Sequence, residues 1–272
     1  MFGGIPMTTA QVFQKGIIKT YRKDIWTPFI KGIKAYNLIQ DGDKIMVAIS
    51  GGKDSLILAK LLQELTNHPL VKFEVVFVAM DPGYTPFNRH RLEENAKLLD
   101  IDLKVENRDI FKIAALKSPK YPCFLCARMR RGALYGLAEQ YGCNKVALGH
   151  HYDDVIETTL LNLFYEGSIK TMLPKLKSDN YEGIQLIRPL YLLREHNIKK
   201  VMKRYNINTL DCACTVTANE TASKRKEIKA LIQQLKTQFG DIDKTIFSAT
   251  NNVYLDHLIG WEKDGVKYRF DE

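Results

Sequence analysis

A short glycine-rich segment of the chain has the composition of a phosphate-binding turn. The segment SGGKDS (50–55) ends the apolar run 44–50 and leads into the stretch 56–65, whose apolar residues recur at helical spacing. Two glycines let the backbone turn sharply, and the N–H groups at the start of a helix favour anions. The spacing fits neither a Walker A loop nor a dinucleotide fingerprint. We therefore predict a different kind of cradle for nucleotide phosphates. Its residues are Ser50, Gly51, Gly52, Lys53, Asp54 and Ser55.

A second polar segment follows a later apolar run. GHHYDD (149–154) stands where the run 144–151 ends and a helical stretch begins. A carboxylate at such a place can hold Mg²⁺ or orient a reacting group, and the alternative is capping of the helix N-terminus. Because a phosphate loop precedes this segment, we interpret it as part of the nucleotide site. The candidates are Gly149, His150, Asp153 and Asp154. Asp81, at the end of the run 73–80, is a further candidate, with a turn role as the alternative.

Four of the five cysteines form two closely spaced pairs. Cys123 and Cys126 form a CxxC, Cys212 and Cys214 form a CxC, and Cys143 stands alone, which favours buried packing for it. Thiols that gather from distant segments indicate a metal site in a reducing compartment. Four thiolates would make a closed zinc site, whereas three would hold a [4Fe–4S] cluster with one open iron. The tight spacing of the CxC favours three ligands.

Strand-like segments alternate with helical stretches over most of the chain. The strand-like segments are 44–50, 73–80, 102–108, 144–151 and 184–190. This alternation predicts an α/β fold with a parallel, roughly five-stranded Rossmann-like sheet and ligands at the carboxyl ends of the strands. Helical N- and C-terminal extensions flank it, and from about residue 216 the pattern is helical only. The expected domains are 1–40, 41–215 with a CxxC insertion, and 216–272.

The composition narrows the classes of function. Hydrophobic residues make up 45% and charged residues 26% of 272 residues, which is ordinary for a globular protein and argues against disorder. No apolar run reaches the ~20 residues of a membrane helix, and the first residues lack a signal-peptide core, so we expect a cytoplasmic protein without a membrane partner. The net charge of +9 favours a polyanionic partner such as nucleic acid.

The motifs together resemble those of one family, the tRNA 2-thiocytidine synthetases, which belong to the PP-loop ATP pyrophosphatase enzymes of tRNA thiolation. The resemblance runs from about residue 44 to 226. It is carried by SGGKDS (50–55), CxxC followed by ARMRRGALY (123–135), ALGHHYDD (147–154), NLFYEG (162–167), MLPKL (172–176), IRPL (187–190) and the late cysteine pair. It implies that residues 41–215 form a PP-loop domain that cleaves ATP between its α and β phosphates.

The resemblance also implies which cysteines bind the cluster. Cys123 and Cys126 would hold a [4Fe–4S] cluster together with one late cysteine. The family's late pair is a CxxC whose second member is the ligand, whereas this chain has a CxC. We therefore expect Cys214 as the third ligand, with Cys212 as the alternate.

Further implications concern catalysis and partners. Asp54 and Asp154 would be catalytic, and Arg130 would face the site. The cofactors would be ATP, Mg²⁺ and the cluster. The substrate would be tRNA, at cytidine 32 of the anticodon loop. A sulfur donor, either a cysteine desulfurase or free sulfide, would be a partner, and a homodimer is the assembly that the resemblance suggests.

The implied chemistry starts from a pyrimidine C2 oxygen, which is a poor leaving group. ATP would adenylate this oxygen and release pyrophosphate, after which sulfide on the open iron would attack C2 and AMP would depart. Positive strips would contact the tRNA phosphates. These strips are Arg128, Arg130 and Arg131, and Lys224, Arg225, Lys226 and Lys229.

Three alternatives remain open at this stage. A lysidine-type PP-loop ligase with a structural zinc site explains the phosphate loop but gives the cysteines no catalytic role. A zinc-stabilised nucleotide- or RNA-binding module would lack catalysis. A thiolation enzyme that carries persulfide on a cysteine would need no metal.

Overall fold

The computed structural model describes residues 7–69, 71–118, 122–210 and 220–271. The chain divides into two compact units. The first unit comprises Met1–Asp154 and Leu173–Asn219, and the second comprises Val155–Met172 and Glu220–Glu272. The second unit thus combines the expected C-terminal region with a short segment from the middle of the chain.

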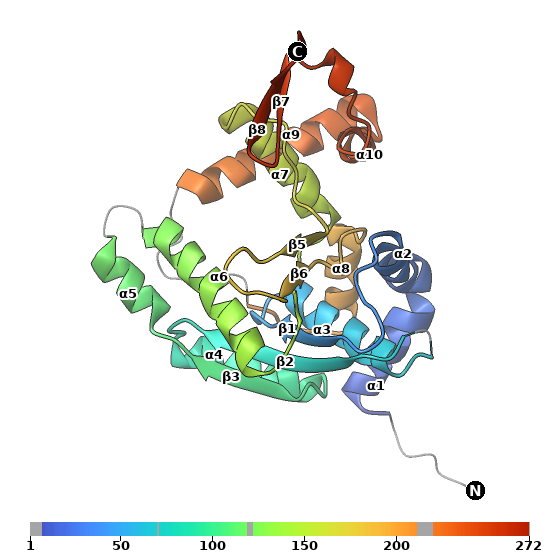
Figure 1. The fold of residues 1–272 in the computed structure, drawn as a ribbon. Coiled ribbons are helices and arrows are strands. Elements are labelled where there is room, and N and C mark those ends of the chain that lie inside the picture. The colour runs from blue at the N-terminus through green and yellow to red at the C-terminus, as the bar shows by residue number, and fades with distance from the viewer. Residues whose placement is uncertain (1–6, 70, 119–121, 211–219, 272) are drawn as a thin grey trace, which may run out of the picture. The chain divides into compact units, whose positions relative to one another are not determined.

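A six-stranded sheet in the order β3-β2-β1-β4-β6-β5 forms the centre of the first unit (Figure 1). Its strands are β1 (Lys44–Ala48), β2 (Glu74–Asp81), β3 (Leu103–Asn107), β4 (Lys145–Ala147), β5 (Lys175–Lys177) and β6 (Gln185–Ile187). All neighbouring strands are parallel except β5 and β6. The five predicted parallel strands and the α/β fold class are confirmed. The short antiparallel edge strand β5 was not predicted.

Helices connect and cover these strands. They are α1 (Thr9–Lys15), the π-helices η1 (Gly16–Thr20) and η2 (Arg22–Trp26), α2 (Thr27–Ala35), α3 (Lys53–Thr66), α4 (Pro86–Leu98), α5 (Ile110–Lys117), α6 (Pro122–Gln140), the start of α7 (Tyr152–Tyr165) and α8 (Glu195–Arg204). Helices between parallel strands are the crossovers that such a sheet requires.

The side chains of the central strands point alternately to the two faces of the sheet and so divide the core into two layers. In β1, Ile45 and Val47 belong to one buried cluster, which also takes in α2, α3, α4 and α8. Met46 belongs to the opposite cluster, which includes residues of α5 and α6. The same alternation separates Phe77 from Val78 in β2. Both faces of the sheet are therefore covered, because successive side chains of a strand point to opposite faces.

The N-terminal helices pack into the first of these layers. Phe13, Ile17 and Phe29 are fully buried in it. The ring of Phe13 lies 5.4 Å from the ring of Tyr205, which follows α8, in an edge-to-face arrangement. The predicted N-terminal helical extension is thus packed against the region of α8.

The second unit contains most of α7 together with α9 (Glu220–Phe239), α10 (Ile242–Ala249) and the short helix η3 (Leu255–His257). Glu157 of α7 is 2% exposed and lies 3.4 Å from Lys229 and 3.8 Å from Arg225 of α9. Lys224 lies over the ring of Tyr165. Lys224, Arg225 and Lys229, three of the four residues of the second positive strip predicted to contact tRNA, therefore have partners within the unit.

The prediction of helical structure alone after residue 216 was wrong. Strands β7 (Gly260–Lys263) and β8 (Val266–Arg269) form an antiparallel hairpin. Its turn residues, Asp264 and Gly265, both have positive φ, at 54° and 80°. Asp-Gly between alternating residues is a strong hairpin signal, and it was present in the sequence.

None of the helices in the described part of the chain combines the length and the hydropathy that spanning a bilayer requires.

A buried ion pair fixes the edge of the sheet at which β1 and β4 begin. The Nζ atom of Lys145 donates to Asp43 Oδ2 at 2.6 Å and to the carbonyl of Leu38 at 2.9 Å.

Lys145→Met leaves the Asp43 carboxylate buried without its cation, so we expect a loss of about 3–5 kcal/mol in the free energy of unfolding. Urea unfolding followed by circular dichroism measures it. Lys104→Met, at an exposed lysine, serves as the control and should change stability by less than about 0.5 kcal/mol. A loss below about 1 kcal/mol in Lys145→Met would contradict this account.

Candidate nucleotide and cysteine site

The glycine-rich loop lies between β1 and α3, at the carboxyl end of the central strand. Gly51 is buried and has φ of +81°, a conformation that side chains rarely adopt. A Cβ atom there would lie 2.6 Å from Leu210 Cδ1 and 3.3 Å from Leu92 Cδ1. The N–H of Leu210 also donates to the Gly51 carbonyl at 3.0 Å. The loop is thus fixed by the segment that follows α8.

Hydroxyl groups hold the loop in shape, and the start of α3 is open to an anion. The Ser55 hydroxyl donates to the Gly52 carbonyl at 2.9 Å, and Ser55 Oγ accepts from the Ser50 amide at 3.2 Å. Gly52 is the N-cap of α3 and offers no side-chain acceptor to the first amides of the helix. Uncapped amides at the N-terminus of a 14-residue helix suit a phosphate group.

A second glycine brings the loop after β4 against this turn. A Cβ atom on Gly149 would lie 3.0–3.1 Å from backbone atoms of Asp54 and Ser55. Strands β1 and β4 are parallel neighbours, so their carboxyl ends emerge side by side. The absence of a side chain at Gly149 lets the two loops touch through their backbones. The two predicted nucleotide segments are therefore adjacent in the structure.

The polar residues after Gly149 organise two helix N-termini. Asp154 Oδ2 accepts from the His151 amide at 2.9 Å, and His151 Nδ1 lies 3.4 Å from the Asp154 amide, a reciprocal capping arrangement at the start of α7. Asp153 Oδ2 accepts from the amide of Glu195, the first residue of α8, at 2.7 Å. Both aspartates thus have the capping role considered from the sequence, although Asp153 caps a different helix from its own. His150 is half-buried in the same loop.

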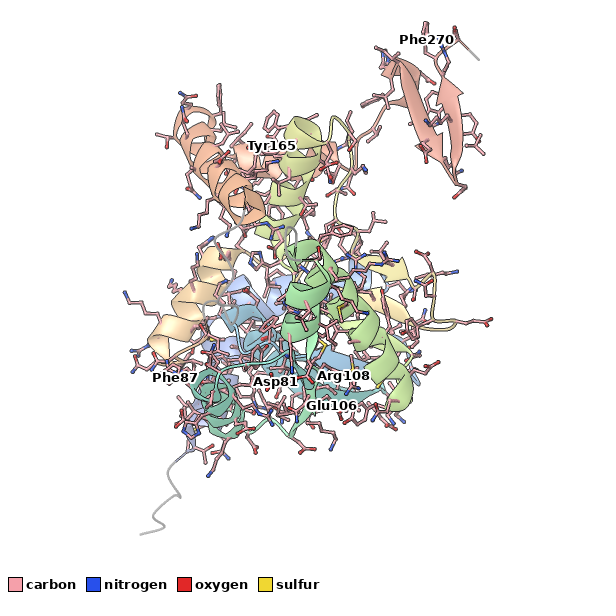
Figure 2. The ribbon with its side chains drawn as sticks, turned by 90° about the vertical axis from the view of Figure 1, so that its left-hand side faces the viewer. Asp81, Phe87, Glu106, Arg108, Tyr165 and Phe270 are labelled. Carbon is pink, nitrogen blue, oxygen red and sulfur yellow. The ribbon has the colours of Figure 1, made fainter. Side chains whose placement is uncertain are left out.

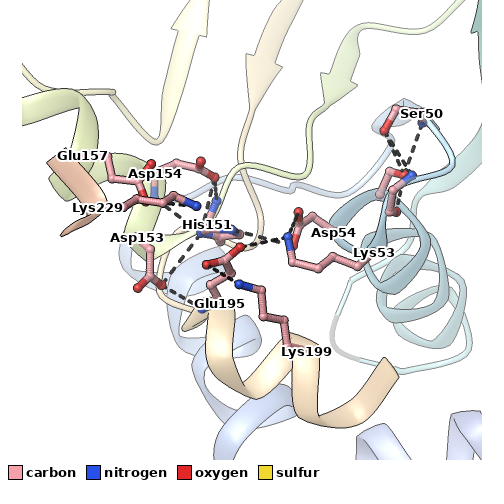
Figure 3. Close-up of polar contacts among 12 residues, drawn as sticks. Ser50, Lys53, Asp54, His151, Asp153, Asp154, Glu157, Glu195, Lys199 and Lys229 are labelled. Atoms are coloured by element: carbon pink, nitrogen blue, oxygen red, sulfur yellow. Dashed lines mark hydrogen bonds and ion pairs between the residues drawn. The ribbon is translucent and has the colours of Figure 1, made fainter. Parts of the chain in front are cut away.

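A network of charged groups lies at this edge of the sheet (Figure 3). The Nζ atom of Lys53 lies 2.9 Å from Asp54 Oδ2 and 3.0 Å from Glu195 Oε1. Burial lowers the pKa of Lys53, but the two carboxylates outweigh this effect and raise it above its ordinary value. Glu195 also pairs with Lys199 at 3.1 Å, and His151 Nε2 lies 3.7 Å from Asp54 Oδ1.

This network fits a magnesium ion that arrives with phosphates. Asp54 Oδ1 is buried and has no hydrogen-bond partner among the described residues. Asp54 and Glu195 pair with Lys53, and Glu195 also pairs with Lys199. The carboxylates of Asp153 and Asp154 lie 3.9 and 3.3 Å from His151 Nδ1. No three His, Cys, Asp or Glu side chains of the described part of the chain converge on a metal position. Mg²⁺ does not require this, because it usually binds one or two carboxylates together with substrate phosphates.

Asp81 closes a turn at the end of β2 (Figure 2). Its Oδ1 accepts from the amides of Gly83 and Tyr84 at 2.9 and 2.6 Å, and its Oδ2 lies 2.9 Å from Arg89 Nη1. Burial raises the pKa of Asp81, but these hydrogen bonds and the Arg89 charge bring it below its ordinary value. The turn role is what these contacts show, and contact with a nucleotide stays a prediction.

The cysteines are only partly within the described structure. Cys126 lies half-buried on α6, one turn after residue 123. The side chain of Cys123, and all of Cys212 and Cys214, lie outside the described residues. Cys143 is 3% exposed in the core, and burial raises the pKa of its thiol, which confirms the prediction of buried packing for it.

The three arginines of the CxxC helix α6 are exposed, and one of them lies near the loop after β2. Arg128, Arg130 and Arg131 are exposed. Burial raises the pKa of Tyr84, in the loop after β2, and the nearby positive charge of Arg130 opposes that rise. Arg130 therefore lies near Tyr84, and its orientation towards the site stays a prediction.

Sequence reasoning missed three residues of this site. Glu195 and His151 bridge the two loops, and Arg188 stands directly after β6, 8% exposed, with its Nη1 donating to the Leu173 carbonyl. Burial lowers the pKa of Arg188. The IRPL and HHYDD motifs contained two of them, whereas no local pattern marked Glu195, because its role depends on the docking of α8.

Comparison with known proteins agrees with this geometry. The family model described as a PP-loop domain matches residues 27–235, and the fold and loop place the chain in that class. A tRNA-cytidine(32) 2-sulfurtransferase of Paraburkholderia xenovorans is 38% identical over 84% of this chain and 68% of its own length. One of Aliivibrio fischeri is 39% identical over 83% and 73%. The chain belongs to the tRNA-cytidine(32) 2-sulfurtransferase family.

A solved structure supports the fold. The U34-tRNA thiolase NcsA from Methanococcus maripaludis with its [4Fe-4S] cluster superposes with a TM-score of 0.68 at 20% identity, over 86% of this chain and 79% of that one. The predicted Rossmann-like PP-loop sheet is thereby confirmed.

Gly51 offers a test of the loop with a matched control. Gly51→Ala and Gly183→Ala both place a side chain at positive φ, +81° and +76°, but only Gly51 has neighbours within 4 Å of the new Cβ. We expect Gly183→Ala to cost about 1–2 kcal/mol of stability through strain alone. Gly51→Ala should cost more and weaken ATP binding at least tenfold, because the loop must shift. Thermal unfolding and calorimetric titration with ATP measure both effects. Equal ATP affinity in the two variants would refute the assignment of the loop.

The depressed pKa of Asp81 predicts a pH-dependent contribution to stability. Because the folded pKa lies below the unfolded one, the ionised carboxylate stabilises the fold fully above about pH 4, and this stabilisation is lost as the pH falls through the folded pKa. Asp81→Asn keeps an acceptor for the turn but loses the Arg89 pair, so we expect a cost of about 1–2 kcal/mol at pH 7 that shrinks towards pH 3. Asp102→Asn, at an exposed position, is the control. A pH-independent difference in unfolding free energy would contradict the assignment.

Proposed function

We propose that the chain catalyses ATP-dependent replacement of the C2 oxygen of cytidine 32 in tRNA by sulfur. The relatives named above carry this activity in their names. The structural observation that supports it most is the hydrogen bond from the Leu210 amide to the Gly51 carbonyl. Leu210 is the last described residue before the segment that holds Cys212 and Cys214, so the chain enters that segment directly from the nucleotide loop.

The residues of the loop have distinct proposed roles in activating the oxygen. The amides at the start of α3, with Gly52 as N-cap, bind the ATP phosphates. Lys53 lies within reach of the same position and balances charge on the pyrophosphate leaving group. Asp54, whose Oδ1 accepts no hydrogen bond from the described residues, and Asp154 hold Mg²⁺ with those phosphates. Adenylation then turns a poor leaving group into AMP.

Sulfur delivery is the proposed role of the cysteines. Cys126 with Cys123 and Cys214, or Cys212 as the alternate, provide three thiolates, the donor type that [4Fe–4S] clusters use. When bound, the cluster would supply the sulfur nucleophile at its open iron. The exposed Arg130 would guide the RNA towards it.

The proposal includes partners beyond tRNA. A cysteine desulfurase or free sulfide would supply the sulfur, since none of the ATP chemistry provides it. A homodimer would be the assembly. The rival functions, a lysidine-type ligase with structural zinc and a zinc-stabilised binding module, both predict a colourless protein.

Anaerobic purification and assay of two cysteine variants test this function. We expect the wild-type protein to absorb near ~400 nm and, with ATP, Mg²⁺ and sulfide, to convert tRNA cytidine to 2-thiocytidine, detected by nucleoside mass spectrometry. Cys126→Ser should lose the absorbance and at least ~100-fold of the thiolation rate, yet bind ATP as before, because a ligand of the open cluster is removed. Cys143→Ala, at the packing cysteine, is the matched control and should keep both properties. A colourless, zinc-containing wild-type protein, or a Cys126→Ser variant that thiolates normally, would refute the proposal.

A further inference from the structure

Two short segments of the first unit carry a surplus of positive charge. Residues 15–34 and 195–204 contain ten lysines and arginines but only two carboxylates, a net charge of +8 in 30 residues. The first segment includes the N-terminal π-helices, and the second is α8. A local surplus of this size calls for an explanation other than general solubility.

Helix α8 separates an apolar face from a basic face. Ile198, Val201 and Met202 are buried in the core. The three lysines and the arginine of this helix are exposed; they are Lys199, Lys200, Lys203 and Arg204. Positions i, i+1, i+4 and i+5 lie along one side of a helix, so these cations form a continuous row.

The π-helix η2 extends this row. It packs against α8, and the Nζ atom of Lys200 lies 5.7 Å from the centre of the Tyr21 ring, directly before η2. Arg22 and Lys23 follow Tyr21 and are exposed. We call the exposed residues Arg22, Lys23, Lys200, Lys203 and Arg204 the α8 surface.

The cations of the α8 surface are not neutralised within the fold, although Lys200 lies over the Tyr21 ring and Arg22 donates to the Ile18 carbonyl. Among the described residues, none of these five side chains has a carboxylate partner within 4 Å. Holding like charges together without counterions costs free energy in a folded protein. A bound polyanion would remove that cost, which is the electrostatic signature of a nucleic-acid contact.

The α8 surface begins at the nucleotide site. Glu195, at the start of α8, pairs with Lys53 of the phosphate loop and with Lys199 one turn further along. A helix of ten residues is about 15 Å long, so the row of cations leads away from the reacting phosphates over that distance. A tRNA whose target base enters the site would have its neighbouring backbone within reach of the row.

The chemistry of the surface favours RNA over a lipid surface. A helix that binds a membrane interface exposes an apolar face to the lipid. The apolar face of α8 is instead buried in the protein core, and its outward positions are cationic.

We propose that the α8 surface binds the sugar–phosphate backbone of the tRNA next to the base that is modified. This inference rests on the proposed function, since it takes tRNA as the substrate. It adds a binding surface on the N-terminal helices and α8 to the arginines of α6.

A charge-neutralising triple variant tests the inference. Lys200→Gln, Lys203→Gln and Arg204→Gln are combined, and Lys199 is left in place because it pairs with Glu195. The matched control combines Lys72→Gln, Lys97→Gln and Lys104→Gln, which remove the same charge from exposed positions. Binding of unmodified tRNA by the anaerobic holoprotein is measured between 50 and 300 mM salt, alongside ATP binding, thermal unfolding and thiolation.

We expect the triple variant to bind tRNA at least tenfold more weakly, and the slope of log affinity against log salt to fall by about 2, because fewer phosphates are neutralised. ATP binding and the unfolding temperature should match those of the control, which should bind tRNA as the wild type does.

The inference is overturned, and the proposed function stands, if the triple variant keeps the wild-type tRNA affinity and salt slope while the wild-type enzyme is active. A wild-type protein that never forms a thionucleoside would instead overturn the proposed function and, with it, the tRNA assignment. Binding to phosphatidylserine vesicles that is lost in the triple variant while tRNA affinity is kept would assign the surface to a membrane and overturn the inference.

Discussion

The contact between two backbones at the carboxyl ends of β1 and β4 determines the rest of the site. Gly149 lies so close to Asp54 and Ser55 that a Cβ atom would meet their backbone at 3.0–3.1 Å. Parallel pairing of β1 with β4 brings the two loops to the same place, and a residue without a side chain allows them to touch. The start of α3, which is open to phosphate, thereby lies beside the start of α7.

This closeness explains why the acidic residues have structural and chemical roles together. Asp154 forms the capping pair with His151, and Asp153 caps α8 through Glu195. Each bond fixes a carboxylate near Lys53 and Asp54 without neutralising it. These carboxylates therefore stay ionised beside the phosphate loop, which is compatible with the divalent cation that we propose to enter with the nucleotide phosphates. Capping and metal binding are compatible roles of the same residues.

Local signals in the sequence were sufficient for the strands and the phosphate loop, but not for contacts made by distant segments. The central strands β1 and β2 were predictable because a strand buried in a covered parallel sheet has a nearly continuous apolar composition. Strand β3, LKVEN, has no buried residue and was predictable from its alternation instead. The edge strand β5 has only three residues, partly or fully exposed, and gave no such signal. Glu195 and Leu210 belong to the site only because α8 and the segment after it dock on the loop, which no local periodicity records. The hairpin of β7 and β8 did have a local signal, its Asp-Gly turn.

Glu195 connects the nucleotide loop to α8 energetically, because two lysines share it as their ion-pair partner. Lys53 and Lys199 both pair with this carboxylate, at 3.0 and 3.1 Å. A phosphate that attracts Lys53 leaves Glu195 with Lys199, so the carboxylate does not become an unpaired charge, and the exchange costs little. The more exposed Lys199 is then held more firmly at the start of the basic row on α8. Because linkage is reciprocal, any polyanion that draws Lys199 away from Glu195 strengthens the hold of Glu195 on Lys53. An anion at the phosphate loop and a polyanion on α8 would thus compete for the two lysines that share Glu195.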